Sequence, residues 1–354
     1  MGDARQMRSF KLTQFRAPLT ETFESPPAPT GTQVLLRVRA CGVCHSDIHL
    51  ADGRFDLGRG RTHDLSGFLP LPLVLGHEIV GVVEEVGPEA SGVSVGDRRL
   101  VYAWTGCGRC AQCRAERENL CATPNNLGIR RNGGFSSYVL VDHPKYLLEF
   151  DPLPEAFAAT LGCSGLTAYS ALKQAGPVDA ANPLLIIGAG GLGLAAVNLT
   201  RALHGVGPVL ADIDATKRQA ALDAGASSVV DPADAEAGKR LLQEIGGFAA
   251  AVDFVGSEAS ANFGLASLRK GGRLFIVGLF GGSIDIPLIT LPNRAVGVIG
   301  VFVGSLPELR ELLALARAGK VQPAPIETRP LEAAQQSLDD LRAGRVRGRV
   351  VLTP

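Results

Sequence analysis

The segment LLIIGAGGLGL, residues 184–194, limits the fold of this chain more than any other part of its sequence. An apolar run precedes three glycines, Gly188, Gly190 and Gly193, in the pattern G-x-G-x-x-G, and an alanine-rich helical pattern follows. Such glycines allow a tight turn, let the backbone approach a pyrophosphate and pack the helix against the strand. The pyrophosphate then faces the helix N-terminus. The motif predicts a βαβ unit that binds a dinucleotide.

An acidic residue at the end of the next strand indicates which dinucleotide is bound. Asp212, in VLADID, lies 19 residues beyond Gly193. A carboxylate there accepts hydrogen bonds from the ribose hydroxyls of NAD and would repel the 2′-phosphate of NADP. Asp214 is the competing acid, but its position is typical of a turn or a helix cap, whereas Asp212 closes the strand. We therefore expect NAD as the cofactor and Asp212 as its ribose ligand.

The rest of the chain predicts an α/β protein with two domains. Short β-like runs (QVLLRVRA, IVGVVEEVG, SYVLVD) occupy residues 30–150 and are separated by Gly, Pro and Asp turns. Apolar strands then alternate with alanine-rich helical patterns as far as about residue 300, which indicates a doubly wound parallel sheet. Two helical runs and a last strand, RGRVVLTP, form the tail. We expect residues 1–164 and 304–354 to form one domain and residues 165–303 to be inserted as the other.

Composition excludes several classes of function. Lys plus Arg number 35 and Asp plus Glu also number 35, so no net field favours nucleic acid or an anionic lipid surface as a partner. No apolar run is long enough to span a membrane. The opening MGDARQMRSFKLTQF has no apolar region of the secretory type. We expect a cytoplasmic protein, a setting in which neighbouring cysteines more often bind metal or react than form disulfides.

Four of the seven cysteines lie close together in CGRCAQCRAERENLC. Cys107, Cys110, Cys113 and Cys121 have the spacing C-x2-C-x2-C-x7-C, and four thiolates can form a closed, structural tetrahedral zinc site. An iron–sulfur cluster is the second interpretation, although such runs differ in spacing and often end in Cys-Pro. Four unconnected thiols and a nucleic-acid-binding zinc module are further alternatives. We expect structural zinc in a lobe over residues 104–122.

A second set of metal-binding residues is dispersed along the chain. Cys44 in ACGVCHSDIH, His77 in GHE and Cys163 in LGCSGLTAYSAL together would give zinc two sulfurs and one imidazole. That donor set leaves a fourth position for water or substrate, which is the arrangement of a catalytic zinc. Each residue alone is weak evidence, since a single buried cysteine is usually a small apolar residue. Cys41 keeps that interpretation: we expect it to be packed and not a ligand.

These motifs, in this order, resemble those of the zinc-dependent, medium-chain alcohol dehydrogenases. The resemblance rests on GVCHSD…GHE, the four-cysteine run and GAGGLG followed by ADID, and it covers nearly the whole chain. It implies a discontinuous catalytic domain with a GroES-like β-barrel core around a Rossmann domain, with the active site between them. It also implies reversible hydride transfer between an alcohol and NAD, and two zinc ions per chain.

The resemblance assigns roles near the catalytic zinc. Cys44, His77 and Cys163 correspond to its ligands, Glu78 to a nearby carboxylate that can approach the metal, and Asp47 to the carboxylate that orients the ring of His77.

A proton relay follows from the same resemblance. Ser46 corresponds to the hydroxyl that hydrogen-bonds the substrate alcohol, and His49 to the outer histidine that passes the proton to solvent.

The resemblance also assigns residues to the cofactor. His45 and Arg349 correspond to pyrophosphate contacts, and Lys217 to a partner of the adenosine ribose. Arg349 and Lys217 are alternatively solvated surface charges. The remaining expected cofactor contacts are Gly188, Gly190, Gly191, Leu192, Gly193, Asp212, Val255, Val277, Gly278 and Leu279.

One segment departs from the family pattern. Cys44 and His77 are 33 residues apart, more than is usual in the family, and the extra sequence lies in residues 53–72. This insertion either lines the mouth of the cleft, contacts another subunit or forms a solvated surface loop. Trp104 is a candidate wall of the substrate pocket, with a place in the core as the alternative.

Assembly and substrate follow only from the resemblance. The apolar stretch AVGVIGVFVGS, residues 295–305, corresponds to a strand that pairs between subunits in the family, although by itself it could be an interior strand. We expect a homotetramer, with a homodimer second. The alternative functions are a specialised zinc dehydrogenase for a polyol, an amino-acid alcohol or a thiol adduct, and a non-catalytic NAD(H)-sensing protein.

Overall fold

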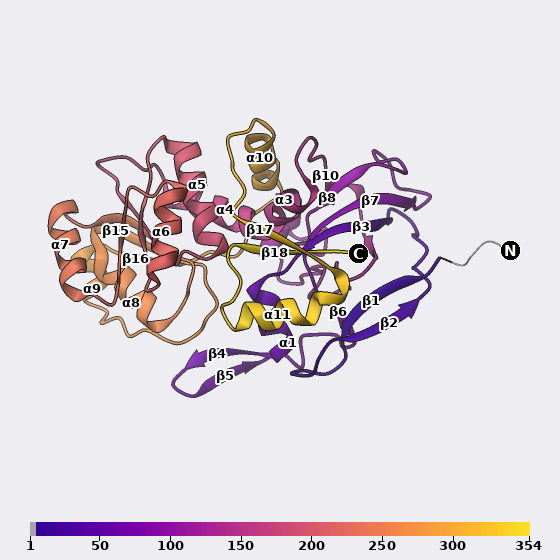
Figure 1. Cartoon of the computed structure of the whole chain (residues 1–354), viewed down its shortest axis with the longest axis horizontal. Helices are drawn as coiled ribbons and strands as arrows, with labels where there is room; N and C mark the ends of the chain where they lie inside the picture. Colours follow the sequence, from indigo (N-terminus) through magenta and orange to yellow (C-terminus); the bar gives the residue numbers. More distant parts are fainter. Residues whose placement is uncertain (1–4) are drawn as a thin grey trace.

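The computed structural model describes residues 5–354, which form two lobes that lie side by side (Figure 1). One lobe is built around a six-stranded sheet in the order β13-β12-β11-β14-β15-β16, and all of its neighbouring strands are parallel. The order is that of the Rossmann fold, in which a ligand binds where the strand order reverses, here between β11 and β14. The predicted doubly wound parallel sheet is confirmed. Its strands are β11 (Leu184–Ile187), β12 (Val209–Ala211), β13 (Ser228–Val230), β14 (Phe248–Asp253), β15 (Leu268–Ile276) and β16 (Gly297–Gly300).

Helices cover both faces of this sheet. Side chains of β11 alternate between two apolar clusters, since Leu184 and Ile186 belong to one and Leu185 and Ile187 to the other. That alternation is the period of two expected of a strand buried on both faces. The helices of this lobe are α4 (Leu166–Ala175), α5 (Gly191–His204), α6 (Ala215–Ala224), α7 (Ala235–Ile245), α8 (Glu258–Ser267) and α9 (Thr290–Arg294).

The second lobe contains two antiparallel-rich sheets, and the larger one includes strands from both ends of the chain. The seven-stranded sheet has the order β10-β8-β7-β3-β18-β17, with β9 also paired to β3, and the three-stranded sheet has the order β2-β1-β6. Val351 of β18 pairs with Gly42 of β3, so the last strand of the chain joins the sheet that β3 begins. The strands are β1 (Met7–Leu12), β2 (Thr20–Glu24), β3 (Val34–Gly42), β6 (Leu73–Val74), β7 (Glu78–Val86), β8 (Arg98–Val101), β9 (Tyr138–Val141), β10 (Leu147–Leu148), β17 (Ile326–Pro330) and β18 (Arg349–Thr353).

Short helices connect and support the second lobe. A continuous helical stretch, α3 (Glu155–Thr160), the π-helical turn η3 (Leu161–Gly165) and α4, carries the chain from one lobe to the other. Among the described residues, no helix has both the length and the apolar character that a membrane span requires. The remaining helices are α1 (His45–Asp52), α2 (Ala111–Arg114), α10 (Leu306–Arg317) and α11 (Ala334–Arg342), with 3₁₀ turns η1 (Glu118–Leu120), η2 (Pro144–Tyr146) and η4 (Leu331–Ala333).

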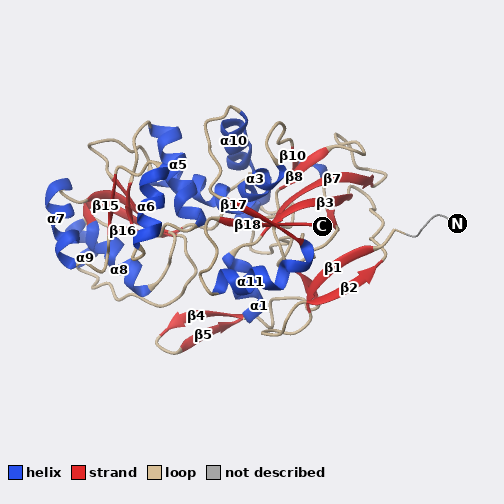
Figure 2. Ribbon diagram, in the orientation of Figure 1, coloured by secondary structure: helices blue, strands red, loops and turns tan. Residues whose placement is uncertain are grey.

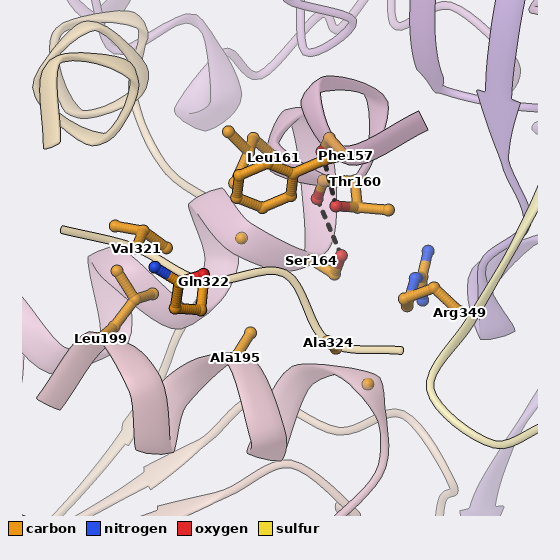
Figure 3. Close-up of a pocket in the computed structure, with 12 residues that line it drawn as sticks. Phe157, Thr160, Leu161, Ser164, Ala195, Leu199, Val321, Gln322, Ala324 and Arg349 are labelled. Carbon is orange, nitrogen blue, oxygen red and sulfur yellow. Dashed lines mark hydrogen bonds between the residues drawn. The ribbon is translucent and has the colours of Figure 1, made fainter. Parts of the chain in front are cut away.

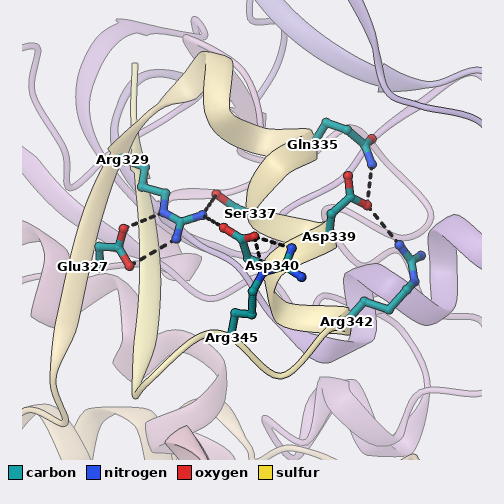
Figure 4. Close-up of polar contacts among 8 residues, drawn as sticks. All are labelled: Glu327, Arg329, Gln335, Ser337, Asp339, Asp340, Arg342 and Arg345. Atoms are coloured by element: carbon teal, nitrogen blue, oxygen red, sulfur yellow. Dashed lines mark hydrogen bonds and ion pairs between the residues drawn. The ribbon is translucent and has the colours of Figure 1, made fainter.

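Polar contacts within the tail join β17 to α11 (Figure 4), and one further ion pair joins the tail to α1. Arg329 of β17 donates to Glu327 and to Asp340 of α11, each at 2.7 Å. Arg342, two residues further on at the end of α11, forms an ion pair of 2.7 Å with Asp52 at the end of α1. The helix that bears Ser46 and His49 is thereby linked to the last fifty residues of the chain.

Residues 53–72 contain a hairpin that belongs to neither lobe's sheets. Its strands β4 (Arg54–Gly58) and β5 (Arg61–Asp64) pair only with each other and project beneath the first lobe (Figure 2).

The expected strand over residues 295–305 is shorter than the sequence suggests. Only Gly297–Gly300 forms β16, because Ala295 and Val303 have positive φ values of 50° and 52° that interrupt an extended backbone.

Candidate active site and metal centres

Four buried side chains with metal-binding atoms meet in the second lobe. The candidate ligand atoms of Cys44, His77, Glu78 and Cys163 all lie within 4.8 Å of one another. Cys44 directly precedes α1, His77 precedes Glu78 at the start of β7, and Cys163 lies in η3. Three distant segments of the sequence therefore bring the predicted ligands together, while Cys41 lies outside the cluster.

This donor set fits a zinc ion. His77 is fully buried and neither of its ring nitrogens makes a hydrogen bond, which is costly for polar atoms away from water. Two sulfurs and an imidazole are donor types that zinc prefers. Burial lowers the pKa of His77, but the Asp47 carboxylate and Cys44 more than offset this and raise it well above its ordinary value. Its surroundings therefore favour a positive charge.

Asp47 holds the loop around His77. Its carboxylate accepts hydrogen bonds from the backbone N–H of Cys44 at 2.9 Å and of Gly76 at 3.3 Å. Asp47 Oδ1 also lies 3.3 Å from His77 Nδ1, close enough for an ion pair although the two groups are not aligned for a hydrogen bond. With Nδ1 toward Asp47, Nε2 is the nitrogen left to bind a metal.

Glu78 connects the metal-binding cluster to the end of the chain. Its Oε2 accepts a hydrogen bond from Arg349 Nη2 at 2.6 Å, and both side chains are buried. Its Oε1 accepts from the backbone N–H of Ser164 at 3.3 Å. Burial raises the pKa of Glu78 to about 7, and the Arg349 charge opposes this rise. The carboxylate is therefore held between the sulfurs and a guanidinium.

Arg349 also touches the glycine loop. A Cβ built on Gly191 would lie 2.5 Å from Arg349 Cδ, so the guanidinium stem crosses the first turn of α5. Gly193 has no room for a side chain either, because a Cβ there would lie 1.8 Å from the carbonyl oxygen of Gly188. Gly190 is the N-cap residue of α5, with half-buried Leu192 in the first turn. The predicted strand–turn–helix is thus present, and Arg349 is buried, not a solvated charge.

A small cavity lies beside this junction (Figure 3). It has a volume of about 20 Å³ and lies between α5 and the α3–η3 helix, with Ser164 and Arg349 on its wall. This is room for about one water molecule. It is therefore no substrate pocket.

The acidic residues after β12 take different positions. Asp212 Oδ2 accepts a hydrogen bond from the backbone N–H of Ala189 in the glycine loop at 2.7 Å. Asp214 caps α6 by accepting from the backbone N–H groups of Thr216 and Lys217, so its predicted capping role is confirmed. Asp212 faces the candidate dinucleotide site, whereas the Lys217 side chain is exposed.

Val255 and residues 277–279, which are expected to contact the nicotinamide, form the cofactor rim. A residue that was not predicted from the sequence, Asp253, holds this rim in place. Asp253, buried at the end of β14, accepts hydrogen bonds from the backbone N–H groups of Val255 and Gly256 and from Ser260 Oγ. Its carbonyl oxygen accepts from the N–H groups of Val277 and Gly278. Leu279, next along the rim, is 46% exposed. The signal for Asp253 was an acid closing an apolar strand in AAAVDFVG.

Ser46 and His49 lie one turn apart on α1. Ser46 Oγ is 3.6 Å from Cys44 Sγ, and the half-buried His49 ring lies 5.3 Å from the ring of Phe55. Burial lowers the pKa of His49. His45, before Ser46, is exposed.

Trp104 packs against the metal-binding cluster. Its ring centre lies 5.1 Å from that of His77, and its Nε1 donates to the carbonyl oxygen of Gly162 at 3.1 Å. Because Gly162 precedes Cys163, Trp104 supports two of the candidate ligands.

The four neighbouring cysteines form a second cluster. The sulfurs of Cys107, Cys110, Cys113 and Cys121 all lie within 4.8 Å of one another, and none forms a disulfide. Hydrogen bonds from the backbone N–H groups of Arg109 and Cys110 lower the pKa of Cys107 to about 6. Four converging thiols with thiolate-stabilising amides fit a closed tetrahedral zinc site.

Comparisons with known proteins identify the family to which this architecture belongs. A family model described as "Alcohol dehydrogenase GroES-like domain" matches residues 30–152, and one described as "Zinc-binding dehydrogenase" matches residues 191–318. The chain therefore belongs to the zinc-binding, medium-chain alcohol dehydrogenase family, and the predicted GroES-like and Rossmann domains are confirmed.

Relatives and solved structures agree with this assignment. The "NAD-dependent alcohol dehydrogenase" of Saccharolobus solfataricus is 39% identical, over 98% of this chain and 100% of its own. The "D-arabinose 1-dehydrogenase (NADP(+))" of the same organism is 33% identical over 97% and 96%. The crystal structure of the alcohol dehydrogenase from Aeropyrum pernix has a TM-score of 0.86 at 30% identity and covers 98% of this chain and 100% of its own.

Proposed function

We propose that this protein is an NAD-dependent alcohol dehydrogenase that reversibly oxidises an alcohol to an aldehyde or ketone at the Cys44–His77–Cys163 site. One observation carries the proposal. A fully buried histidine without hydrogen bonds lies beside two thiols, and Arg349 joins this cluster to the glycine loop. Metal-binding and dinucleotide-binding features thus meet at one place, as hydride transfer requires.

Zinc bound by Cys44, His77 and Cys163 would lower the pKa of the substrate alcohol and polarise the product carbonyl. Ser46, on the first turn of α1, hydrogen-bonds the substrate hydroxyl and gives up its own hydroxyl proton as it takes up that of the alcohol. His49, one turn further and half-buried, passes that proton to solvent. Its lowered pKa keeps the ring neutral at pH 7, which is the state that can accept a proton.

NAD would supply the hydride acceptor and bind across the carboxyl ends of β11 and β14. The backbone of Gly188–Gly193 and the N-terminus of α5 receive the pyrophosphate, with His45 and Arg349 nearby. Asp212 hydrogen-bonds the adenosine ribose with Lys217 beside it. Val255 and the segment 277–279 receive the nicotinamide. Trp104 supports the ligand shell and forms one wall of the substrate pocket.

Zinc at Cys107, Cys110, Cys113 and Cys121 would be structural. The segment around it, residues 104–122, is joined to the rest of the second lobe by contacts that include an ion pair of 2.7 Å between Lys145 and the buried Glu118. Such a closed site stabilises a loop without taking part in catalysis.

A homotetramer, or else a homodimer, is proposed as the assembly, in the cytoplasm. β16 is the edge strand of its sheet, and Leu288 and Ile289 nearby are 82% and 64% exposed. An unpaired edge with apolar neighbours is suited to pairing with a second copy. We place the domain boundaries at 164/165 and 303/304.

A sugar or polyol is the second candidate substrate class. The observation that favours it is the 33% identity to a D-arabinose dehydrogenase over nearly the full chain.

The test is NADH formation by purified, zinc-loaded protein over primary, secondary, aromatic and polyol substrates, with NAD and NADP in parallel. Cys44→Ala removes a proposed ligand, and Cys41→Ala is the matched control because Cys41 is an equally buried cysteine outside the cluster. Turnover that requires NAD, survives in C41A and vanishes in C44A supports the proposal. Turnover that persists in C44A, or none with any alcohol despite tight NADH binding, contradicts it.

A further inference from the structure

The β4–β5 hairpin is buried only at its tip. All four residues of β5 are exposed and β4 is largely exposed, but Gly58 is buried. The element that covers Gly58 is the segment 281–283 of the other lobe, since a Cβ on Gly58 would lie 2.7 Å from the backbone nitrogen of Ser283. The hairpin, which follows α1 of the second lobe, therefore reaches across to the first lobe, which contains the parallel sheet.

The contact is made backbone to backbone and requires glycine on both sides. A Cβ on Gly281 would lie 2.7 Å from Asp56 Cβ and 2.8 Å from its carbonyl oxygen. That oxygen accepts a long hydrogen bond of 3.4 Å from the N–H of Gly282. Gly58 and Gly281 both have positive φ values, 75° and 104°, which glycine adopts without strain. The two segments are therefore closely packed against each other, backbone to backbone.

An ion pair adds to the contact. The Arg59 guanidinium at the turn of the hairpin pairs with the Asp285 carboxylate, and both side chains are largely exposed. An exposed pair of this kind contributes little by itself. It does, however, fix which residues lie opposite each other.

The segment held by the hairpin continues the expected nicotinamide rim. The N–H of Phe280 donates to the carbonyl oxygen of Val255 at 3.2 Å, and that of Gly281 donates to Gly256 at 2.9 Å. Both acceptors lie in the loop that Asp253 organises, and the segment directly follows Val277–Leu279. A force on residues 281–285 is therefore transmitted to the cofactor rim through two backbone hydrogen bonds.

The base of the hairpin, residues 52–55, is also held in place by contacts with α1 and α11. The N–H of Gly53 donates to the carbonyl oxygen of His49 at 3.0 Å, and Phe55 packs on the His49 ring. Asp52 is paired with Arg342 of α11 at 2.7 Å. The hairpin thus extends rigidly from the helix that carries the proposed proton relay.

We propose that the β4–β5 hairpin is an interdomain clasp. It holds residues 281–285 against β4, keeps the adjoining cofactor rim in place and so slows the dissociation of NADH. Asp56, Gly58 and Arg59 act as positioning residues through that segment and do not touch the reacting atoms. The proposal rests on the proposed function, because it requires NADH in the cleft.

Two glycines of the hairpin turn provide a matched test. Gly58→Ala places a methyl group against Ser283, whereas Gly60→Ala has the same backbone cost, with φ of 72°, but no atom within 4 Å of the new Cβ. In zinc-loaded enzyme, stopped-flow fluorescence should show NADH dissociating roughly five-fold faster or more in G58A, the lower range for coupling between sites. The rate in G60A should equal that of the wild type. In cofactor-free protein, hydrogen exchange at the Gly282 amide should be faster in G58A than in wild type, and it should be unchanged in G60A.

A charge swap tests the clasp with exposed residues that do not threaten folding. Arg59→Glu should speed NADH release roughly two- to five-fold at low ionic strength, and adding Asp285→Arg should restore it. Equal release from wild type, G58A and G60A, or an unrestored charge swap, would overturn the clasp. Failure of the proposed function would give a different result. The wild type would then bind NADH but oxidise no alcohol, and the NADH release rates of the variants could still be compared.

Discussion

Arg349 and Glu78 form a buried ion pair, with Arg349 Nη2 2.6 Å from Glu78 Oε2, that joins the last strand of the chain to the metal-binding cluster. The two side chains are 5% and 0% exposed. Arg349 lies over Gly191 at the start of α5 as well. One arginine side chain therefore contacts the carboxylate beside the candidate metal with its guanidinium and the loop expected to bind pyrophosphate with its aliphatic stem. The sequence assigned these residues separate roles, and their contact was not foreseen.

Removing Arg349 should destabilise the fold strongly. Arg349→Met leaves Glu78 buried without its partner, and loss of one partner of such a pair costs about 3–5 kcal/mol when the remaining group stays charged. Because the pKa of Glu78 is already about 7 and Arg349 opposes its rise, Glu78 takes up a proton in the variant near pH 7, which brings the cost toward the lower end of this range. Urea unfolding of the zinc-loaded protein measures this change. Glu78→Gln in the same chain should recover most of the loss, because the remaining buried group is then neutral. Arg347→Met is the matched control at an exposed position two residues away, and a loss as large as that of R349M would contradict the argument.

Asp212 should determine the choice between NAD and NADP. Asp212→Asn keeps an acceptor for the Ala189 N–H but removes the charge. Since hydrogen bonds to charged groups contribute about 1.5–3 kcal/mol, kcat/KM for NAD should fall at least about ten-fold. Activity with NADP should rise relative to NAD, because repulsion of the 2′-phosphate is lost. Steady-state kinetics with both cofactors check this.

Asp214→Ala is the comparison for that experiment. It removes the cap of α6 and should cost about 1 kcal/mol of stability. The preference for NAD should stay as in the wild type. A shift of cofactor preference in D214A comparable to that in D212N would show that helix stability, not the Asp212 carboxylate, sets the preference.

The Rossmann lobe and the four-cysteine cluster could be predicted because their signals are local. G-x-G-x-x-G between a strand and a helix, and four cysteines within a short run, constrain the chain through nearby residues alone. Cys44, His77 and Cys163 were assigned by their donor types and by resemblance, and the fold brings their ligand atoms within 4.8 Å, together with Glu78.

What could not be predicted depends on contacts between distant segments. An acid that closes an apolar strand marks Asp253, but the sequence does not show that its carbonyl oxygen accepts hydrogen bonds from the N–H groups of Val277 and Gly278, more than twenty residues further along the chain. The fit of Gly58 against Ser283 joins positions 225 residues apart, and a glycine in a turn has many local explanations. The short β16 likewise reflects positive φ values at Ala295 and Val303, two non-glycine residues whose types do not indicate them.

Loss of one thiol from the four-cysteine cluster should remove zinc without removing the active site. Cys110→Ser should lower the metal content from two zinc ions to one per chain, because a closed site needs all four sulfurs. The melting temperature should fall, while the remaining folded protein still binds NADH. Metal analysis and calorimetry test this, and Cys41→Ser, which retains two zinc ions, is the control. Unchanged metal content in C110S would contradict a zinc site there.

His49 should set the pH dependence of alcohol oxidation. Burial lowers its pKa below the ordinary 6.5, with Asp52 partly opposing, so the ring is neutral and able to accept a proton at pH 7. Wild-type rates should therefore decline only as the pH falls through this lowered pKa. His49→Gln removes the acceptor and should slow oxidation near pH 7 by up to about 100-fold. The loss should shrink at alkaline pH, where hydroxide takes the proton directly.

The same profile distinguishes a relay from a structural role. If His49 served only to pack against Phe55, the His49→Gln variant would lose rate equally at every pH. His143→Gln, at an exposed position in the same lobe, should leave the profile unchanged. Asp52→Asn removes a negative charge that raises the pKa of His49, so its acidic limb should move to lower pH. A shift in the opposite direction would mean that the group titrating in the profile is not His49.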